Sequence, residues 1–202
     1  MQLVFATNNA HKIQEMQAAI GSQVELITLR QAGIDIDIPE PHDTLEQNAS
    51  EKSSTIHKLT GKNTFSEDTG LEVMALNGEP GVKSARYAGD HKDFSHNITK
   101  LLTNLSGKEN RKARFRTVIS LILDGREYFF EGICEGEIIP DLRGSEGFGY
   151  DPVFVPAGSG KTFAEMSMAE KNVYSHRRKA GDKLVDFLHQ HINTQFQTAS
   201  TT

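Results

Sequence analysis

The sequence has 202 residues, of which 37% are hydrophobic, and its formal net charge is −5. This apolar content is enough for a folded core at this length, which excludes a wholly disordered chain. The acidic balance argues against a nucleic-acid-binding protein, and the apolar runs are too short to span a membrane.

Cys134 is the only cysteine, so no disulfide can form within the chain. The first residues lack the basic segment of a signal peptide and become polar at Thr7. We therefore expect a soluble, cytoplasmic protein. We also expect one domain over residues 1–194, followed by a polar, frayed tail at 195–202.

Short strands and helices alternate in the first half of the chain. A strand is predicted at residues 3–6, and the helix after it carries Ile13, Met16 and Ile20 on one face. The other elements of this half are a strand at 24–29, a helix at 44–59 after a proline break, and a short strand at 63–65.

A hairpin dominates the second half. An amphipathic helix at residues 93–105 precedes two strands, 113–123 and 127–135, which join at Asp124-Gly125, a dipeptide typical of hairpin turns. Helices interleaved with strands and one hairpin predict an α/β fold, a mixed sheet flanked by helices. The last elements are a strand at 153–155 and a helix from about Ser175 that buries Ala180, Leu184, Leu188 and Ile192.

Residues 158–162 read Gly-Ser-Gly-Lys-Thr and resemble the end of a phosphate-binding P-loop. The full pattern requires a glycine where this sequence has Val155, and the segment does not follow a hydrophobic first strand. We therefore interpret it as a surface loop.

The junction between the first strand and the first helix is a candidate anion site. Free backbone amides and the positive end of the helix dipole attract phosphate at such a junction. Thr7, Asn9 and Lys12 add side-chain donors. The alternative is that Asn9 only caps the helix and that Lys12 is solvated.

The segment Glu67-Asp68-Thr69-Gly70 follows the short strand and is a candidate metal site. Two adjacent carboxylates at a strand end suit Mg²⁺, and either could orient a water molecule as a general base. Glu40 is a further carboxylate that could reach the same ion. The alternative is an acidic turn without function.

Two later segments suit recognition of a flat ring. In residues 147–152, glycines allow close approach, Phe148 offers a stacking face and Asp151 offers an acceptor. Near the last helix, Arg177 is a rigid fork of donors suited to a carbonyl or phosphate oxygen. The alternatives are a structural turn and an ordinary charged helix start. Together, these segments indicate a nucleotide site with Mg²⁺.

These segments resemble, in order, the dITP/XTP pyrophosphatase (inosine triphosphatase) family. The resemblance implies a fold of two lobes with the active-site cleft between them, and a Mg²⁺-dependent homodimer. It also implies hydrolysis of ITP, dITP and XTP to the monophosphate and pyrophosphate, which removes deaminated purines from the nucleotide pool. The matching segments are residues 6–15, 67–71, 80–89, 147–152, Lys171 and 175–177.

The resemblance assigns roles to the phosphate and metal residues. Asp68 matches the family's metal-binding and proton-accepting acid, and Glu40 matches the other metal carboxylate. Thr69 matches a position next to the substrate, and Lys52 a second phosphate cation. The triphosphate loop is matched by Thr7, Asn8, Asn9, Ala10, His11 and Lys12.

The same resemblance assigns the recognition of the base. Members commonly carry glycine where this chain has Asn8, a residue that tolerates left-handed backbone. We expect Arg177 to donate to a 6-keto oxygen. It should reject ATP, because adenine presents a donor at that position, but not GTP, which also has a 6-keto group. The base side is matched by Phe148, Gly149, Tyr150, Asp151, Lys171, His176 and Arg177.

Two other functions fit the same residues. One is a Mg²⁺-dependent phosphatase that releases orthophosphate, which product identity would distinguish. The other is a non-catalytic nucleotide-binding sensor. The intact pair Glu67-Asp68 argues against a sensor, because binding alone needs no base.

Overall fold

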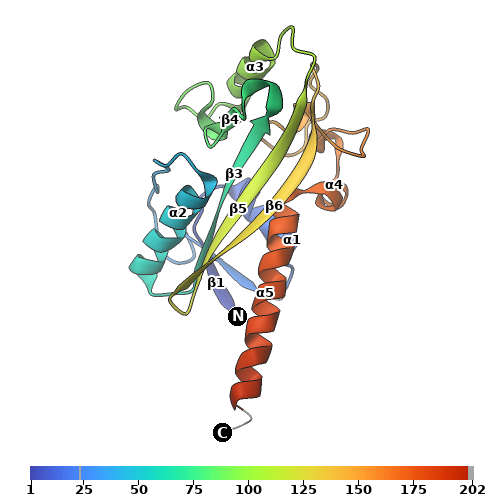
Figure 1. Cartoon of the computed structure of the whole chain (residues 1–202). Coiled ribbons are helices and arrows are strands. Elements are labelled where there is room, and N and C mark those ends of the chain that lie inside the picture. Colours follow the sequence, from blue (N-terminus) through green and yellow to red (C-terminus); the bar gives the residue numbers. More distant parts are fainter. Residues whose placement is uncertain (23, 200–202) are drawn as a thin grey trace.

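The structure is a computed structural model that describes residues 1–22 and 24–199 (Figure 1). The described residues form a mixed sheet in the order β2-β1-β3-β5-β6-β7, with β4 paired to β3. β1 runs parallel to β2 and β3, and the other pairs are antiparallel. The strands are β1 (Gln2–Phe5), β2 (Glu25–Thr28), β3 (Thr64–Val73), β4 (Pro80–Gly81), β5 (Lys112–Leu123), β6 (Arg126–Ile138) and β7 (Phe154–Pro156).

Helices cover the sheet, which confirms the predicted fold class. α2 packs on β3 and β5, whereas α1 packs against α5, which lies on β5 and β6 (Figure 1). None of the helices in the described ranges has the length and apolar character needed to cross a bilayer. The helices are α1 (Ala10–Ile20), α2 (Leu45–Thr60), α3 (Phe94–Asn104), α4 (Met168–Tyr174) and α5 (His176–Ala199).

The long strands β3, β5 and β6 pass through two lobes, each with its own core (Figure 1). On β3, Phe65 lies in the core next to α1 and α5, whereas Leu71 lies in the core beside α3. The polar residues between them therefore sit where the lobes meet. This position on β3 places the candidate site.

The hairpin and most element boundaries are confirmed. Asp124 and Gly125 have φ of 50° and 76°, as a type I′ turn requires. The prediction that the acidic segment follows a short strand is wrong, because Ser66 to Gly70 pair with β5 throughout. Sequence reasoning also missed α4, although the capping-box pair Ser167 and Glu170 signals its start.

The end of the chain differs from the prediction. The polar residues expected in a tail from 195 continue α5 as far as Ala199, since no glycine or proline ends the helix there. Residues 200–202 lie outside the described residues, as does the side chain of Ile192. Ala180, Leu184 and Leu188 are buried as predicted.

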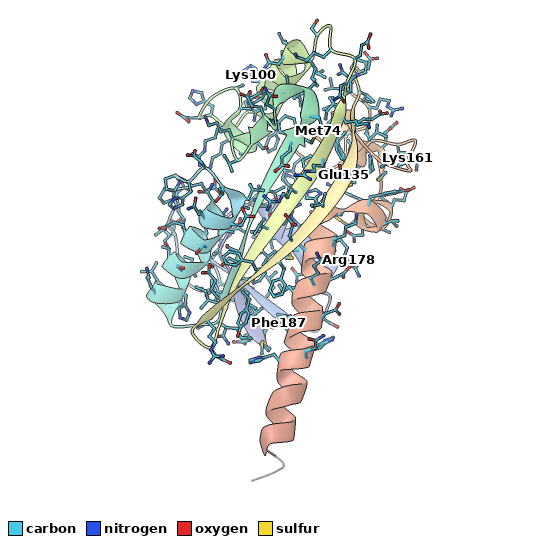
Figure 2. The ribbon with its side chains drawn as sticks, in the orientation of Figure 1. Met74, Lys100, Glu135, Lys161, Arg178 and Phe187 are labelled. Atoms are coloured by element: carbon cyan, nitrogen blue, oxygen red, sulfur yellow. The ribbon has the colours of Figure 1, made fainter. Side chains whose placement is uncertain are left out.

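The P-loop-like segment lies at the surface, as interpreted from the sequence. Lys161 sits at the outer edge of the molecule (Figure 2), and its ammonium lies 2.7 Å from a carboxylate oxygen of Glu170. Thr162 forms a capping box with Glu165. Thr162 therefore caps the short helical turn that follows it, and Lys161 links the segment to α4.

Candidate active site

The loop before α1 is fixed by its own side chains. Oδ1 of Asn9 accepts hydrogen bonds from the amides of His11 and Lys12, at 3.0 and 3.2 Å, so Asn9 does cap the helix. The alternative that Lys12 is solvated is wrong, since its ammonium lies 3.1 Å from Oε1 of Glu67 and its side chain is 16% exposed. The loop therefore presents helix-start amides and one anchored cation.

Asn8 fits this loop without left-handed backbone. Among the described non-glycine residues, positive φ occurs at Asn77, Lys92 and Asp124, and not at Asn8. The side-chain Nδ2 of Asn8 donates to the backbone carbonyl of Ile36 at 2.8 Å. This bond holds the loop after β2 against the start of α1.

Glu67 and Asp68 are neighbours on β3, and their side chains point to opposite faces of the sheet. Glu67 is fully buried and binds Arg177 and Lys12, which come from α5 and α1. Burial alone would raise the pKa of Glu67, but the charges of Arg177 and Lys12 outweigh it and lower the pKa to about 2. The expectation that both adjacent acids suit one metal ion is therefore wrong. Glu67 belongs to the opposite face.

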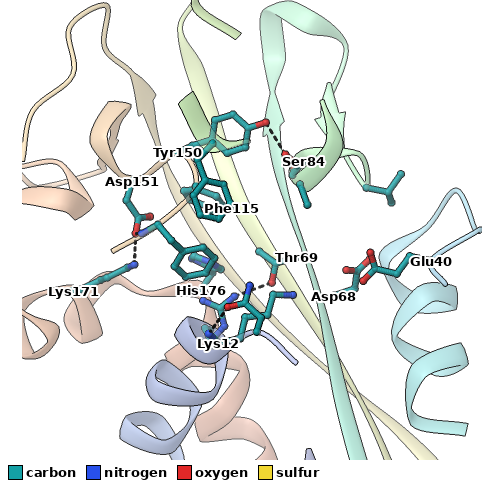
Figure 3. Close-up of a pocket in the computed structure, with 17 residues that line it drawn as sticks. Lys12, Glu40, Asp68, Thr69, Ser84, Phe115, Tyr150, Asp151, Lys171 and His176 are labelled. Atoms are coloured by element: carbon teal, nitrogen blue, oxygen red, sulfur yellow. Dashed lines mark hydrogen bonds and ion pairs between the residues drawn. The ribbon is translucent and has the colours of Figure 1, made fainter. Parts of the chain in front are cut away.

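Asp68 faces α2. Its Oδ1 lies 3.3 Å from the ammonium of Lys52, which also lies 2.6 Å from Oε1 of Glu40. The other oxygen, Oδ2, is buried without a hydrogen-bond partner in the part of the chain that the structure describes. Burial raises the pKa of Asp68, and Lys52 offsets this only in part. Figure 3 shows the Glu40 and Asp68 carboxylates side by side.

Glu40 is held by cations from both sides of the cleft. Besides Lys52, it contacts Arg86, whose Nη2 lies 3.2 Å from Oε2. Burial would raise the pKa of Glu40, but Lys52 and the other nearby cations lower it, and the carboxylate stays ionised. No group of three or more metal-ligating side chains occurs within the described ranges. Glu40 and Asp68 could thus supply only part of a metal's coordination.

The predicted base side is joined by a chain of buried charges. Lys171 lies 2.7 Å from Glu15 and 2.6 Å from Asp151, and Oδ2 of Asp151 also accepts the amide of Phe148 at 2.9 Å. Arg177 binds the other oxygen of Glu15. Burial raises the pKa of Asp151, with Lys171 opposing it. The structure therefore brings Phe148, Asp151, Lys171 and Arg177 together, and Figure 3 shows the ion pair of Asp151 and Lys171.

Arg177 is 2% exposed and has little donor capacity left. Its Nε and Nη2 donate to Glu67, Nη2 also donates to Thr69 at 3.3 Å, and Nη1 donates to Glu15. A single Nη1–H remains for a ligand. The charges of Glu67 and Glu15 outweigh the effect of burial and raise the pKa of Arg177, so it stays cationic.

His176 lies beside Arg177 and is 3% exposed. Its ring stacks on Phe115, with centroids 4.7 Å apart, and its buried Nδ1 has no partner among the described residues. Burial and the charge of Arg177 lower the pKa of His176 well below its usual range. The ring is therefore a neutral imidazole at physiological pH.

Tyr150 forms part of the wall of the cleft. It is buried, and its hydroxyl donates to the carbonyl of Ser84 at 2.8 Å (Figure 3). Gly149 has a φ of 62°, which glycine adopts readily. These two residues shape the turn that presents Phe148.

Two adjoining hollows share one wall. A cavity of ≈ 110 Å³ is lined by the base-side residues and by Asp68 and Thr69, and one of ≈ 200 Å³ is lined by Thr7, Asn8 and Lys52. The residues common to both hollows are Asn9, Lys12, Glu40, Ala85 and Phe94. The wider hollow has three lysines and two carboxylates in its lining, and the narrower one contains most of the aromatic rings.

Phe148 stands at the mouth of the narrower hollow. It stacks on His11 with centroids 5.1 Å apart, and it lies 6.1 Å from Phe94. Ala10 provides the first residue of α1, so its amide belongs to the helix start. The residues predicted from the sequence for the phosphate and base sides thus line these two hollows, except Ala10 and His11.

Sequence reasoning gave no role to several residues of this cleft. Glu15 binds both Lys171 and Arg177, and Arg86 binds Glu40. The ring of Phe115 stacks on that of His176, and the carbonyl of Ser84 accepts a hydrogen bond from the hydroxyl of Tyr150. The motifs at residues 6–15 and 80–89 contain Glu15, Ser84 and Arg86, but local pattern does not indicate their partners.

The sequence model of the Ham1 family matches residues 3–187. A protein of Porphyromonas gingivalis called dITP/XTP pyrophosphatase is 50% identical over 188 residues, which covers 93% of this chain and 97% of that protein. A protein of the same name from Flavobacterium johnsoniae is 47% identical and covers 93% and 98%. The solved Ham1 protein of Staphylococcus aureus superimposes with a TM-score of 0.85 at 40% identity, over 95% of this chain and 100% of that one.

Proposed function

This chain belongs to the Ham1 family, and we propose that it hydrolyses the non-standard purine nucleotides ITP, dITP and XTP to the monophosphate and pyrophosphate. The observation that carries the proposal is the pair of adjoining hollows, one with three lysines in its lining and the other with aromatic rings and Asp68. A triphosphate fits the first hollow and a purine the second. The names of the curated relatives support the same reaction.

The phosphates are bound by the loop from Thr7 to Lys12, with its helix-start amides, and by Lys52. A triphosphate carries about four negative charges, so two lysines alone neutralise only part of its charge. Burial lowers the pKa of Lys52, but Asp68 and Glu40 outweigh this and raise it, so Lys52 stays cationic. The amides then orient the triphosphate, and the lysines balance part of its charge.

Glu40 and Asp68 hold a Mg²⁺ ion in this proposal. The fit is supported by Oδ2 of Asp68, which is buried beside a second carboxylate and has no hydrogen-bond partner among the described residues. Sites built from one or two carboxylates and substrate phosphates are usual for this ion. When bound, Mg²⁺ neutralises phosphate charge and makes a coordinated water more acidic.

Asp68 is also the proton acceptor. Its raised pKa lies closer to neutral pH than the pKa of an ordinary aspartate does, which makes Asp68 a better base. Asp68 lines the narrower hollow and its neighbour Glu40 lines both, which puts Asp68 near the start of the triphosphate. The attacking water gives its proton to Asp68, and pyrophosphate leaves.

The base is read by stacking and by few donors. Phe148 stacks on the purine, and the remaining Nη1–H of Arg177 donates to the 6-keto oxygen. Adenine presents a 6-amino donor to this cation, and an unmatched buried donor costs about 1–3 kcal/mol. Lys171, Asp151 and the neutral ring of His176 complete the polar edge of the pocket.

We further propose a homodimer in the cytoplasm, with residues 1–194 as its one catalytic domain. A phosphatase that releases orthophosphate and a non-catalytic sensor are both less favoured by the names of the relatives. The clearing of deaminated purines from the nucleotide pool is the corresponding biological role.

Incubation of the protein with ITP, dITP, XTP, ATP and GTP tests this function. Reactions contain Mg²⁺, and the products are resolved by ion-exchange chromatography. We expect the monophosphate and pyrophosphate from ITP, dITP and XTP, and little product from ATP. Orthophosphate with a diphosphate would instead indicate the phosphatase, and binding of ITP without any product would indicate the sensor.

A further inference from the structure

Lys52 occupies the space between the two carboxylates proposed to hold the metal. Its ammonium lies 2.6 Å from Oε1 of Glu40 and 3.3 Å from Oδ1 of Asp68. The side chain is 8% exposed, so water competes little for these contacts. Without substrate, one oxygen of each carboxylate, Oε1 of Glu40 and Oδ1 of Asp68, already has a cationic partner.

Arg86 strengthens this competition from the other side of the cleft. It lies in a short helical turn, Ser84–Arg86, and its Nη2 is 3.2 Å from Oε2 of Glu40. Both oxygens of Glu40 are therefore paired. Two positive and two negative side chains meet here, so the four charges cancel and attract a divalent cation only weakly.

We propose that Lys52 is a built-in competitor of the divalent cation. It holds Glu40 and Asp68 while the cleft is empty and releases them when a triphosphate gives its ammonium a new partner. This inference rests on the proposed function for the triphosphate and for the metal site at Glu40 and Asp68. Its consequence is that the metal binds weakly to the free protein and tightly together with the nucleotide, because the coupling is reciprocal.

The test is the affinity of the nucleotide-free protein for Mn²⁺, used as the probe and measured by electron paramagnetic resonance of the unbound ion. Lys52→Met keeps the length of the side chain and removes the charge. One charge at this distance moves the ionisation equilibrium of a carboxylate by about one to three pK units. We therefore expect Mn²⁺ to bind Lys52→Met at least about tenfold more tightly than the wild type.

Three controls show where and why the affinity changes. Lys58→Met removes an exposed lysine from the same helix and changes the net charge equally, and Lys52→Arg keeps the positive charge. Both should bind Mn²⁺ as the wild type does. Adding Asp68→Asn to Lys52→Met should abolish the gain, which places the ion at Asp68. Circular dichroism checks that each variant is folded, and Lys52→Gln replaces Lys52→Met if that variant is not.

Equal Mn²⁺ affinity in the wild type and Lys52→Met would overturn the inference. So would an equal gain in Lys58→Met, which indicates a general effect of charge, or a gain that survives Asp68→Asn. None of these outcomes depends on turnover. The wild-type assay for pyrophosphate release from ITP judges the proposed function separately.

Discussion

Arg177 and Glu67 form a two-point ion pair in the middle of the protein. Nε of Arg177 lies 2.6 Å from Oε2 of Glu67, and Nη2 lies 2.9 Å from Oε1. Both side chains are buried. The pair joins α5 to β3 beside Lys12, which contacts Glu67 and lines both hollows, so it fixes the base side relative to Asp68.

This pair makes stability depend on pH. The pKa of Glu67 falls from an ordinary 4.5 to about 2 on folding, so its stabilisation is complete above 4.5 and is lost as the pH falls toward 2. The loss is on the order of 3 kcal/mol in the free energy of unfolding. Urea unfolding between pH 5 and pH 2.5 (about the range of the shift) should show a flatter pH dependence in Glu67→Gln. The control Glu72→Gln, on the same strand, should retain the wild-type slope.

Asp68→Asn should abolish turnover while leaving the fold intact. The amide neither accepts the proton nor contributes charge to the metal. Loss of a positioned base costs about 10²–10⁴-fold in rate, and the lost ligand adds to this. Pyrophosphate release from ITP measures the effect. Activity within about threefold of the wild type would remove Asp68 from the catalytic role, since even the smallest expected loss is larger.

Lys12→Ala should raise KM for ITP and lower kcat, because the cation meets phosphate charge in both the ground state and the transition state. A charge-assisted hydrogen bond contributes about 1.5–3 kcal/mol, which corresponds to a loss of about 10- to 100-fold in kcat/KM. Steady-state kinetics with the exposed Lys62→Ala as control gives the comparison. Unchanged constants in Lys12→Ala would mean that Lys12 only neutralises Glu67.

Arg177→Ala should lower the ratio of kcat/KM for ITP over ATP. The variant also takes a buried cation away from Glu15, which keeps Lys171, and from Glu67, which keeps Lys12. Removing one partner of a buried ion pair costs about 3–5 kcal/mol in stability. The ratio does not depend on the folded fraction, because both substrates meet the same enzyme. Phe148→Ala should instead weaken all purine triphosphates similarly, since stacking is tolerant of base identity. An unchanged ratio in Arg177→Ala would mean that another residue reads the base.

Gly147→Ala should impair the base side far more than Gly149→Ala. Both positions have positive φ, 74° and 62°, and an alanine there costs about 1 kcal/mol. Only at Gly147 would the new Cβ meet Oδ2 of Asp151, at 2.0 Å. That oxygen holds Lys171, so KM for ITP should rise in this variant alone. Equal KM values in both variants would show that Asp151 moves away from the new Cβ without weakening the binding of ITP.

The sequence by itself determined the order of the elements and the local chemistry of each loop. Asn9 as a cap and the Asp124-Gly125 turn both depend on neighbours within a few residues. Such contacts are encoded locally, and pattern was sufficient to predict them. The whole set of segments, in order, also indicated the family.

Tertiary structure decided which charges meet. Lys171 binds Glu15 across 156 positions of the chain, and Arg177 binds Glu67 across 110. Nothing local in the sequence encodes these pairs, because they depend on the packing of α1 and α5 on the sheet. Strand geometry also separated Glu67 from Asp68, since successive side chains of β3 point to opposite faces. The strand predicted from the sequence was too short to include these two acids. Because β3 extends through both, the alternation of its side chains places Glu67 against Arg177 and leaves Asp68 for the cleft.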